Sequence, residues 1–376
     1  MRIGVPKEIR EGEKRVALMP DVIAKLIKSG VAVTIESGAG VHAQAADSDY
    51  VAAGAEIKSG DVISGADVVF SVQPLTPAQM GLVKRGAVTI SFMSPVTASD
   101  SIDAAATAGA TTFSMELIPR ISRAQSMDAL TSQALCAGYK AALVGAELSP
   151  RFFPMLMTAA GTITPAQVLV LGAGVAGLQA IATARRLGAV VSAYDVRPSS
   201  ADEVKSMGAT FIELELEALE GAGGYAREMT EERAQKQREL LKPFIAKSHV
   251  LITTAAVPGR QAPRLVTKDM VDVMSPGSVI IDLAAETGGN VEGSQPGETI
   301  VTNNGVTMWG GKDVPSMLPF HSSSQYSKNC VNLLTLMLVP EKDGAPASLN
   351  INFDDEIIAG ACVAHQGARR GAAERR

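Results

Sequence analysis

The sequence predicts an α/β protein with two doubly wound parallel-sheet domains separated by a cleft. Three observations favour this fold class. The chain has 376 residues, more than one compact domain usually holds. Apolar strand-like runs alternate with helical patterns in both halves, which is typical of parallel strands joined by right-handed crossovers. The 35 glycines suit the tight turns that such connections need.

The first domain is predicted from the alternation over residues 1 to about 125. The run "RIGVP" is typical of a short strand, "PDVIAKLIKSG" of a helix that ends at Gly30, and "VAVTIES" of the next strand. Further strands are expected at "ADVVFSVQ", "GAVTISFMS" and "ATTFSME".

Two long helices, over 128–148 and 320–339, are predicted to take the chain across to a second domain and back. Between them the alternation restarts, with strands expected at "QVLVLG", "AVVSAYD", "ATFIELE", "SHVLITTAA", "GSVIIDLA" and "TIVTNNG". The strand-like runs "SLNINF" and "EIIAGACV" would then complete the first domain. We therefore assign residues 1–127 plus 321–376 to the first domain and 128–320 to the second.

Composition excludes several classes of protein. A net charge of −5 leaves no basic stripe for nucleic acid. Cys136, Cys330 and Cys362 form no paired motif, so we expect a reducing compartment and no metal site. The N-terminus lacks the pattern of a signal peptide. The uncharged stretch 152–184 is cut by prolines and glycines, so we expect no direct membrane insertion.

A phosphate-binding loop is predicted at "VLVLGAGVAGLQA", where Gly172, Gly174 and Gly177 have G-x-G-x-x-G spacing. The motif directly follows an apolar strand and opens a helix, which is the context that it requires in a Rossmann-like domain. The glycines allow a tight turn, close approach to a pyrophosphate, and close packing of helix on strand. The alternative is a structural glycine turn that binds nothing.

The next strand ends in "SAYDVRP", which places Asp195 18 residues after Gly177. A carboxylate at this position accepts hydrogen bonds from the ribose hydroxyls and repels a 2′-phosphate, so NAD(H) should be preferred over NADP(H). Arg197 weakens this inference, because arginine can hold a 2′-phosphate.

A candidate lid lies in "LEGAGGYAREM". Gly221, Gly223 and Gly224 make a hinge, and Tyr225 could fold over a bound nucleotide. Gln237, on the helix that follows, could reach the same ligand. The alternative is a solvated surface loop.

The block "PRISRAQSMD" places Arg120, Arg123, Gln125 and Asp128 within nine positions before an apolar helix. An ordinary helix start needs a single capping side chain. One interpretation is therefore a ligand-binding loop, and the other is a helix cap with a polar rim.

Over nearly its whole length the chain resembles the NAD(H)-binding alpha subunit (domain I) of the proton-translocating nicotinamide nucleotide transhydrogenase, and more distantly alanine dehydrogenase. The resemblance rests on "PKEIREGEKRVALMP", "ELIPRISRAQSMD", "MTAAGT", "LGAGVAGLQAIATARRLGA", "GGYAREM" and "PGSVIIDLAAETGGN". The block "PRISRAQSMD" is the specific part of it. The same resemblance favours the lid interpretation of Tyr225 over the surface loop.

The resemblance implies that Arg120, Gln125, Asp128 and Thr131 hold the nicotinamide mononucleotide half of NAD(H), with serine usual in the family where Thr131 stands. Arg120 and Asp128 are assigned to the carboxamide side and Gln125 to the ribose, and these three form the expected catalytic set. Gln125 is also expected to reach toward the second nucleotide. The remaining expected cofactor-binding residues are Ile121, Ser122, Ala173, Val175, Val196 and Ala256, besides Gly172, Gly174, Gly177, Asp195, Arg197, Gly224, Tyr225 and Gln237.

The departures from alanine dehydrogenase argue against amino-acid dehydrogenation. That family has a lysine and a histidine where this chain has Gln73 and Ser94, and an aspartate where it has Glu286. An amide and a hydroxyl supply neither the cation nor the proton donor that reduction of a C=O or C=N bond requires. Arg15 matches the substrate-binding arginine but cannot run that reaction alone.

The resemblance implies direct hydride transfer between NADH and NADP⁺, the second nucleotide being bound on a partner subunit. The expected enzyme is a Re/Si-specific, proton-translocating NAD(P)⁺ transhydrogenase that is active only with its NADP(H)-binding and membrane subunits. A homodimer is expected. The chain is expected to be the stand-alone subunit of a split enzyme, and to lie on the cytoplasmic face of the inner membrane as a peripheral protein held by its partner subunits. Two alternatives stay open: an alanine-type amino-acid dehydrogenase, and a non-catalytic NAD(H)-binding regulatory module.

Overall fold

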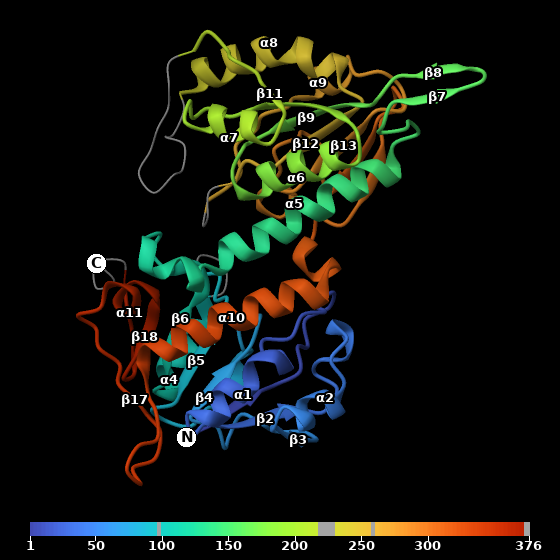
Figure 1. Ribbon diagram of the computed structural model, residues 1–376. Coiled ribbons are helices and arrows are strands. Elements are labelled where there is room, and N and C mark those ends of the chain that lie inside the picture. Colours follow the sequence, from blue (N-terminus) through green and yellow to red (C-terminus); the bar gives the residue numbers. More distant parts are fainter. Residues whose placement is uncertain (96–98, 217–229, 257–259, 372–376) are drawn as a thin grey trace. The chain divides into compact units, whose positions relative to one another are not determined.

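The computed structural model describes residues 1–95, 99–216, 230–256 and 260–371. The chain divides into two compact units (Figure 1). The first comprises Met1–Gln133 and Pro315–Arg376, and the second comprises Ala134–Val314. Each unit is an open, mainly parallel sheet with helices packed on it, so the predicted α/β fold class is confirmed.

The sheet of the first unit runs in the order β19-β18-β6-β5-β4-β1-β2-β3. Its strands are β1 (Arg2–Val5), β2 (Ala32–Glu36), β3 (Glu56–Lys58), β4 (Val68–Phe70), β5 (Val88–Ser91), β6 (Thr111–Ser114), β18 (Cys362–His365) and β19 (Ala368–Arg369). The six strands β1 to β6 are parallel, whereas β18 and β19 are antiparallel to their neighbours. The chain builds outward from β1 to β3 and then restarts at β4 on the other side of β1. This reversal places a topological switch point between β1 and β4.

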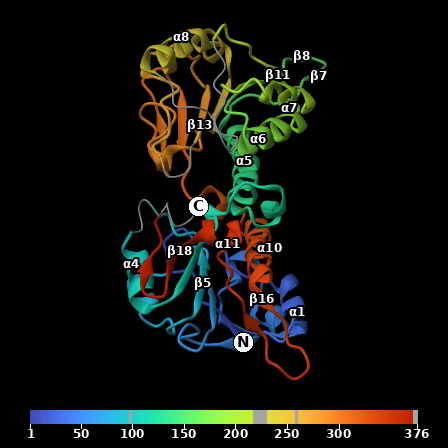
Figure 2. The ribbon, with the colours of Figure 1, turned by 90° about the vertical axis from the view of Figure 1, so that its left-hand side faces the viewer.

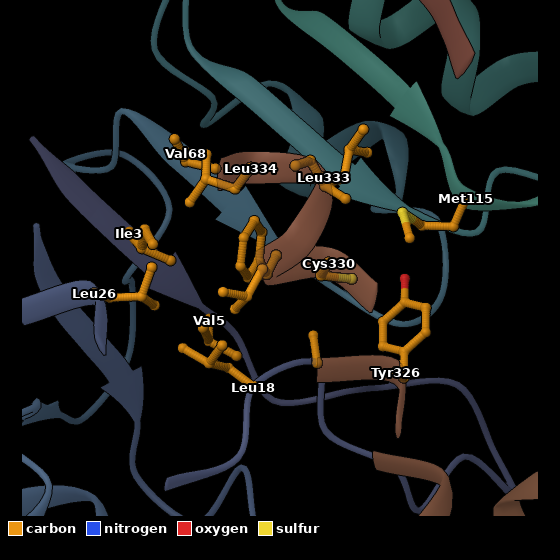
Figure 3. Close-up of a cluster of buried hydrophobic side chains, with 14 of the residues drawn as sticks. Ile3, Val5, Leu18, Leu26, Val68, Met115, Tyr326, Cys330, Leu333 and Leu334 are labelled. Atoms are coloured by element: carbon orange, nitrogen blue, oxygen red, sulfur yellow. The ribbon is translucent and has the colours of Figure 1, made fainter. Parts of the chain in front are cut away.

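The helices of the first unit include one long element, α10 (Pro319–Met337), which is buried along much of its length. Figure 3 shows its side chains Tyr326, Cys330, Leu333 and Leu334 among apolar side chains of the sheet region. The Tyr326 hydroxyl donates to the carbonyl of Ser71, at 2.9 Å, just after β4. The other helices are α1 (Pro20–Lys28), α2 (Asp47–Ala52), α3 (Pro77–Met80), α4 (Ser99–Ala108) and α11 (Glu356–Ala361), with the 3₁₀ helices η1 (Val41–Ala43), η2 (Met115–Leu117), η3 (Ser122–Met127) and η6 (Val314–Met317).

The sheet of the second unit runs in the order β11-β10-β9-β12-β13-β15-β14. Its strands are β9 (Gln167–Leu171), β10 (Val190–Tyr194), β11 (Thr210–Phe211), β12 (Val250–Thr253), β13 (Val279–Asp282), β14 (Thr299–Val301) and β15 (Thr307–Gly310). All neighbours are parallel except β14, which is antiparallel to β15. The helices are α5 (Ala129–Leu148), which belongs to this unit from Ala134 onward, α6 (Val175–Arg186), α7 (Ser200–Ser206), α8 (Glu231–Lys247) and α9 (Lys268–Val271), with the 3₁₀ helix η5 (Ala285–Thr287).

Some local expectations are wrong. The run "EIIAGACV" is not a strand throughout: its first six residues form α11, and only Cys362 onward is extended, as part of β18 beside α4 (Figure 2). "SLNINF" contributes only β17 (Ser348–Leu349), which pairs with β16 (Leu338–Val339) outside the main sheet. The sequence does not predict strand β15. Within the uncharged stretch 152–184 a hairpin of β7 (Leu156–Thr158) and β8 (Gly161–Ile163) precedes β9, and the sequence does not predict it.

No helix in the part of the chain that the structure describes is long and apolar enough to cross a membrane. The predicted long helices are present as α5 and α10, each within two residues of the expected bounds.

Helices α5 and α6 approach so closely that a side chain is excluded at one position. A Cβ on Gly138 would lie 2.0 Å from the carbonyl oxygen of Ala176 in the first turn of α6. Because that neighbour is backbone, it cannot rotate away, and the whole of α6 would have to shift.

Gly138→Ala should therefore destabilise the second unit by about 1–3 kcal/mol despite the better helix propensity of alanine. The only tryptophan, Trp309 in β15, packs against the core of this unit, so its fluorescence in urea measures the unfolding midpoint. An unchanged midpoint for Gly138→Ala would contradict the close helix contact.

Candidate functional site

The predicted phosphate-binding loop lies at the switch point of the second sheet. From β9 the chain builds toward β10 and β11 on one side, and then restarts at β12 on the other. In open parallel sheets, ligands bind at the carboxyl ends of the strands at such a point. The loops after β9, β10 and β12 meet at this edge, and they contain Gly172, Asp195 and Ala256.

Each glycine of the loop has a separate geometric reason. Gly172 has a φ of 99°, in the left-handed region that favours glycine. A Cβ on Gly177 would lie 1.8 Å from the carbonyl oxygen of Gly172, so only glycine lets α6 pack on β9. A Cβ on Gly174 would meet no atom within 4 Å. The space beside Gly174 is therefore open to a ligand.

The start of α6 fits an anion. Gly174 is the N-cap and provides no side-chain cap, so the first amides of the helix, at Val175 and beyond, remain for a ligand. Ala173 precedes it and donates its backbone N–H to Asp195, at 2.7 Å. An uncapped helix start next to open space is what a pyrophosphate requires.

Asp195 is fixed rather than exposed. Besides the Ala173 amide, its carboxylate accepts from Arg197 through the backbone N–H, Nε and Nη2, each at 2.9 Å. Its side chain is 8% exposed, and Val196 packs partly buried against the core below. The Asp195 carboxylate and the glycine loop are thus held together, and Arg197 forms an ion pair with Asp195 in this structure.

The loop after β12 is shaped by two residues that sequence reasoning missed. Asn290 accepts from the Ala255 amide at 3.0 Å and donates to the carbonyls of Ala255 and Pro263, both at 2.8 Å. Asp282, at the end of β13, is fully buried and accepts from Thr253 and from the backbone amide of Val291. Ala256 follows Ala255 and is partly buried. The signal in the sequence that could have identified them was a polar residue directly after an apolar strand, Asp282 in "IIDLA", and another at the end of a glycine turn, Asn290 in "TGGN".

The candidate lid lies outside the residues that the structure describes, since Gly221, Gly223, Gly224 and Tyr225 fall between the described ranges. Gln237 is in α8 and is 1% exposed. Its Oε1 accepts from the hydroxyl of Tyr194 at 3.2 Å, and burial raises the pKa of that hydroxyl to about 12. A contact of Gln237 with a nucleotide stays a prediction.

The block "PRISRAQSMD" forms η3 in the first unit. Ala124 and Met127 are buried and anchor the 3₁₀ helix in the core, since residues three apart lie on the same face. Arg120 and Gln125 are exposed, whereas Ile121 and Ser122 are placed at the start of the turn. The fold therefore presents the polar side chains of this block outward on an anchored support.

Two carboxylates fix the ends of this block. Asp128 accepts from the backbone N–H and the hydroxyl of Thr131, at 2.9 and 2.6 Å, and so acts as the cap of α5. Arg123 donates to both oxygens of Asp355, at 2.8 and 2.9 Å, and Asp355 in turn caps α11. The structure thus supports the helix-cap interpretation for Asp128 and Thr131. Capping gives no reason for the exposed side chains of Arg120 and Gln125.

A pocket of about 410 Å³ lies at the switch point of the first sheet, beside Glu8, Arg10, Gln73 and Ser94. Gln73 accepts from Arg10 at 2.8 Å and donates to Glu13 at 2.7 Å. Burial raises the pKa of Glu8 to about 7. The amide of Gln73 is therefore already engaged with protein groups on both sides.

Arg15 is likewise committed within the protein. It donates to both oxygens of Glu13, from Nε at 2.8 Å and Nη2 at 2.6 Å, and from Nη1 to Gln133 at 2.9 Å. Glu286 belongs to the second unit and accepts from the Asp313 amide at 3.0 Å.

Comparison with known proteins identifies the family. The model of the alanine dehydrogenase/PNT N-terminal domain matches residues 4–137, and that of the C-terminal domain matches 141–370. The chain belongs to the alanine dehydrogenase/PNT family. It is 48% identical to an NAD(P) transhydrogenase alpha subunit of Rhodospirillum rubrum over 98% of this chain and 97% of that one.

Other members of the family agree with this placement. A transhydrogenase structure from Sinorhizobium meliloti superposes with a TM-score of 0.89 at 42% identity, covering 98% of this chain and 100% of that one. Alanine dehydrogenase of Mycobacterium tuberculosis is more distant, at 31% identity over 79% of this chain and 76% of that one. The resemblance inferred from the sequence is confirmed.

On the sequence-based expectation that Asp195 accepts hydrogen bonds from the adenosine ribose, Asp195→Ala should weaken NADH binding about tenfold to a hundredfold. It should also narrow the expected preference for NADH over NADPH, since the change removes the carboxylate that pairs with Arg197. Dissociation constants for NADH and NADPH by isothermal titration measure both effects. Asp202→Ala, which removes an acid from the first turn of α7, is the matched control. If selectivity survives intact in Asp195→Ala, another residue selects the cofactor.

Proposed function

We propose that this chain is the NAD(H)-binding subunit of a proton-translocating, Re/Si-specific NAD(P)⁺ transhydrogenase. The observation that supports this most is η3: its apolar residues anchor it, while Arg120 and Gln125 are directed outward from a support held by Asp128 and Arg123. Relatives at 45–48% identity are named as transhydrogenase alpha subunits.

The residues present fit the proposed cofactor. The open space at Gly174 and the uncapped start of α6 suit its pyrophosphate, and Asp195 suits its adenosine ribose. Arg120, Gln125, Asp128 and Thr131 would hold the nicotinamide half, by resemblance. The cofactor itself supplies the hydride chemistry.

The protein's task in such a reaction is placement. Hydride transfer between two nicotinamide rings needs no acid or base, and it needs the donor and acceptor carbons about 3–3.5 Å apart. Gln73 and Ser94 stand where alanine dehydrogenase has a lysine and a histidine, and at those two positions they offer no cation or proton donor of the kind that carbonyl reduction needs. This favours transhydrogenation over an alanine-type dehydrogenase.

The proposal includes partners. NADP(H) would lie on a separate subunit, proton movement would belong to a membrane subunit, and this chain would be held on the cytoplasmic face of the inner membrane through them. A homodimer is part of the proposal. The β7–β8 hairpin supports it, because Met157 in β7 is 80% exposed and Met155 just before β7 is also exposed, and a second copy would cover such apolar side chains.

The deciding experiment mixes the purified chain with the NADP(H)-binding and membrane subunits, and follows NADPH-dependent reduction of an oxidised NAD analogue by absorbance. Reduction that requires both components is expected. Tight NADH binding without reduction would favour a regulatory module, and NADH oxidation with pyruvate and ammonia would favour an amino-acid dehydrogenase.

Gln125→Asn should lower the rate of hydride transfer by about tenfold to a hundredfold while NADH affinity changes little, because the shorter side chain misplaces the ring. Single-turnover rates and NADH dissociation constants measure the two effects separately. Gln325→Asn makes the same shortening in α10 and should match the wild type. Equal losses of hydride-transfer rate and NADH affinity in Gln125→Asn would contradict the proposed role of Gln125 in placing the nicotinamide ring.

A further inference from the structure

Two asparagines of α10 donate to a single carbonyl oxygen in η3. The Nδ2 atoms of Asn329 and Asn332 lie 2.9 and 3.0 Å from the carbonyl oxygen of Ser126. The two residues are three apart and so project from one face of the helix. Both lone pairs of that oxygen are thereby used.

The carbonyl of Ser126 needs an outside donor because η3 ends immediately after it. The 3₁₀ helix stops at Met127, and Asp128 is extended, with φ −73° and ψ 90°. A carbonyl in the last turn of a helix has no partner within the helix. One donor would satisfy this requirement, and α10 supplies two.

The amide of Asn329 is itself fixed by a partly buried chain of hydrogen bonds. Its Oδ1 accepts from the hydroxyl of Ser132 at 2.7 Å, and Gln133 donates to that hydroxyl oxygen at 3.1 Å. Gln133 then accepts from Arg15 at 2.9 Å. Because its oxygen is occupied by Ser132, the Asn329 side chain presents its NH₂ group to Ser126.

We propose that Asn329 and Asn332 are positioning residues for hydride transfer, which fix the Ser126 carbonyl and thereby the direction of the adjacent Gln125. This inference rests on the proposed function, because it gives the asparagines their effect through the nicotinamide-holding block. Asn329 is 6% exposed, and both asparagines donate to the Ser126 carbonyl, so the effect argued here reaches the nicotinamide-holding block through the backbone of η3.

The test replaces each amide by a carboxylate of the same shape, which removes the donor and repels the carbonyl. Asn332→Asp is the main variant, because its partly exposed position tolerates a charge, and Asn329→Asp is the second. Gln325→Glu is the matched control: it makes the same exchange of amide for carboxylate in the same helix, at a residue without a bond to Ser126 among those described.

Three quantities are measured on the chain assembled with its partner subunits. We expect the catalytic rate of Asn332→Asp to fall about tenfold or more, with the NADH dissociation constant changed less than about twofold. We expect a larger kinetic isotope effect with NADPH deuterated at the transferred position, since the hydride step becomes more limiting. Gln325→Glu should match the wild type in all three. Full activity in Asn332→Asp, or equal losses of rate and NADH affinity, would overturn the proposal.

A measurement without catalysis separates this proposal from the proposed function. Hydrogen–deuterium exchange of the backbone amides of residues 121–129 should become about tenfold faster in Asn332→Asp and remain unchanged in Gln325→Glu. Unchanged exchange in Asn332→Asp would show that the asparagines do not fix the Ser126 carbonyl, and it would overturn this proposal whatever the activity. If the wild-type assembly is inactive but exchange is faster in Asn332→Asp, the proposed function is overturned, whereas the fixing of the Ser126 carbonyl by the asparagines is supported.

Discussion

The first unit depends on the buried ion pair of Glu13 and Arg15, whose side chains are 0% and 6% exposed. A buried pair is tolerated only when its remaining donors and acceptors are also satisfied, and removing one partner typically costs about 3–5 kcal/mol. Here Gln73 follows β4, Gln133 lies in α5, and Ser316 in η6 donates to Glu13 at 2.8 Å. Burial alone would raise the pKa of Glu13, but hydrogen bonds and charge from Arg15 lower it from 4.5 to about 2. The stability from this pair is therefore fully present above pH 4.5 and is lost as the pH falls toward 2.

The second unit also contains a buried carboxylate, and the hydrogen-bond partners that the structure describes for it do not include an arginine. Asp282 is fully buried at the end of β13, and the hydroxyl of Thr253 and nearby backbone amides satisfy its oxygens. Asn290 continues the arrangement to Ala255 in the loop after β12. In both units, therefore, buried polar side chains near the carboxyl ends of parallel strands hold the loops there by hydrogen bonds. In the second unit, fixed loops at that edge suit the expected cofactor, because binding to a fixed loop costs little ordering of the protein.

Short-range patterns in the sequence were sufficient for part of this arrangement. The strand, glycine spacing and helix around Gly172 follow one another directly, so local chemistry predicts them. The four residues of β15 have no period to detect, and the short apolar run of α11 fits a helix as well as a strand. The contacts of Arg15 with Gln133 and of Asn329 with Ser126 join residues 118 and 203 positions apart, and no local pattern encodes them. The cofactor roles of Arg120 and Gln125 come from family resemblance and stay predictions.

Asp128 joins the two interpretations of "PRISRAQSMD" that the sequence left open. Its carboxylate caps α5 through Thr131, and it is also one of the residues expected to hold the nicotinamide carboxamide. A carboxylate has about four acceptor positions, and Thr131 uses two, so both roles fit one side chain. The cap then fixes the carboxylate before any ligand arrives. In the proposed hydride transfer, which needs no acid or base, such prior fixing is the main contribution a protein can make to the rate, and the hydrogen bonds that converge on η3 agree with that proposal.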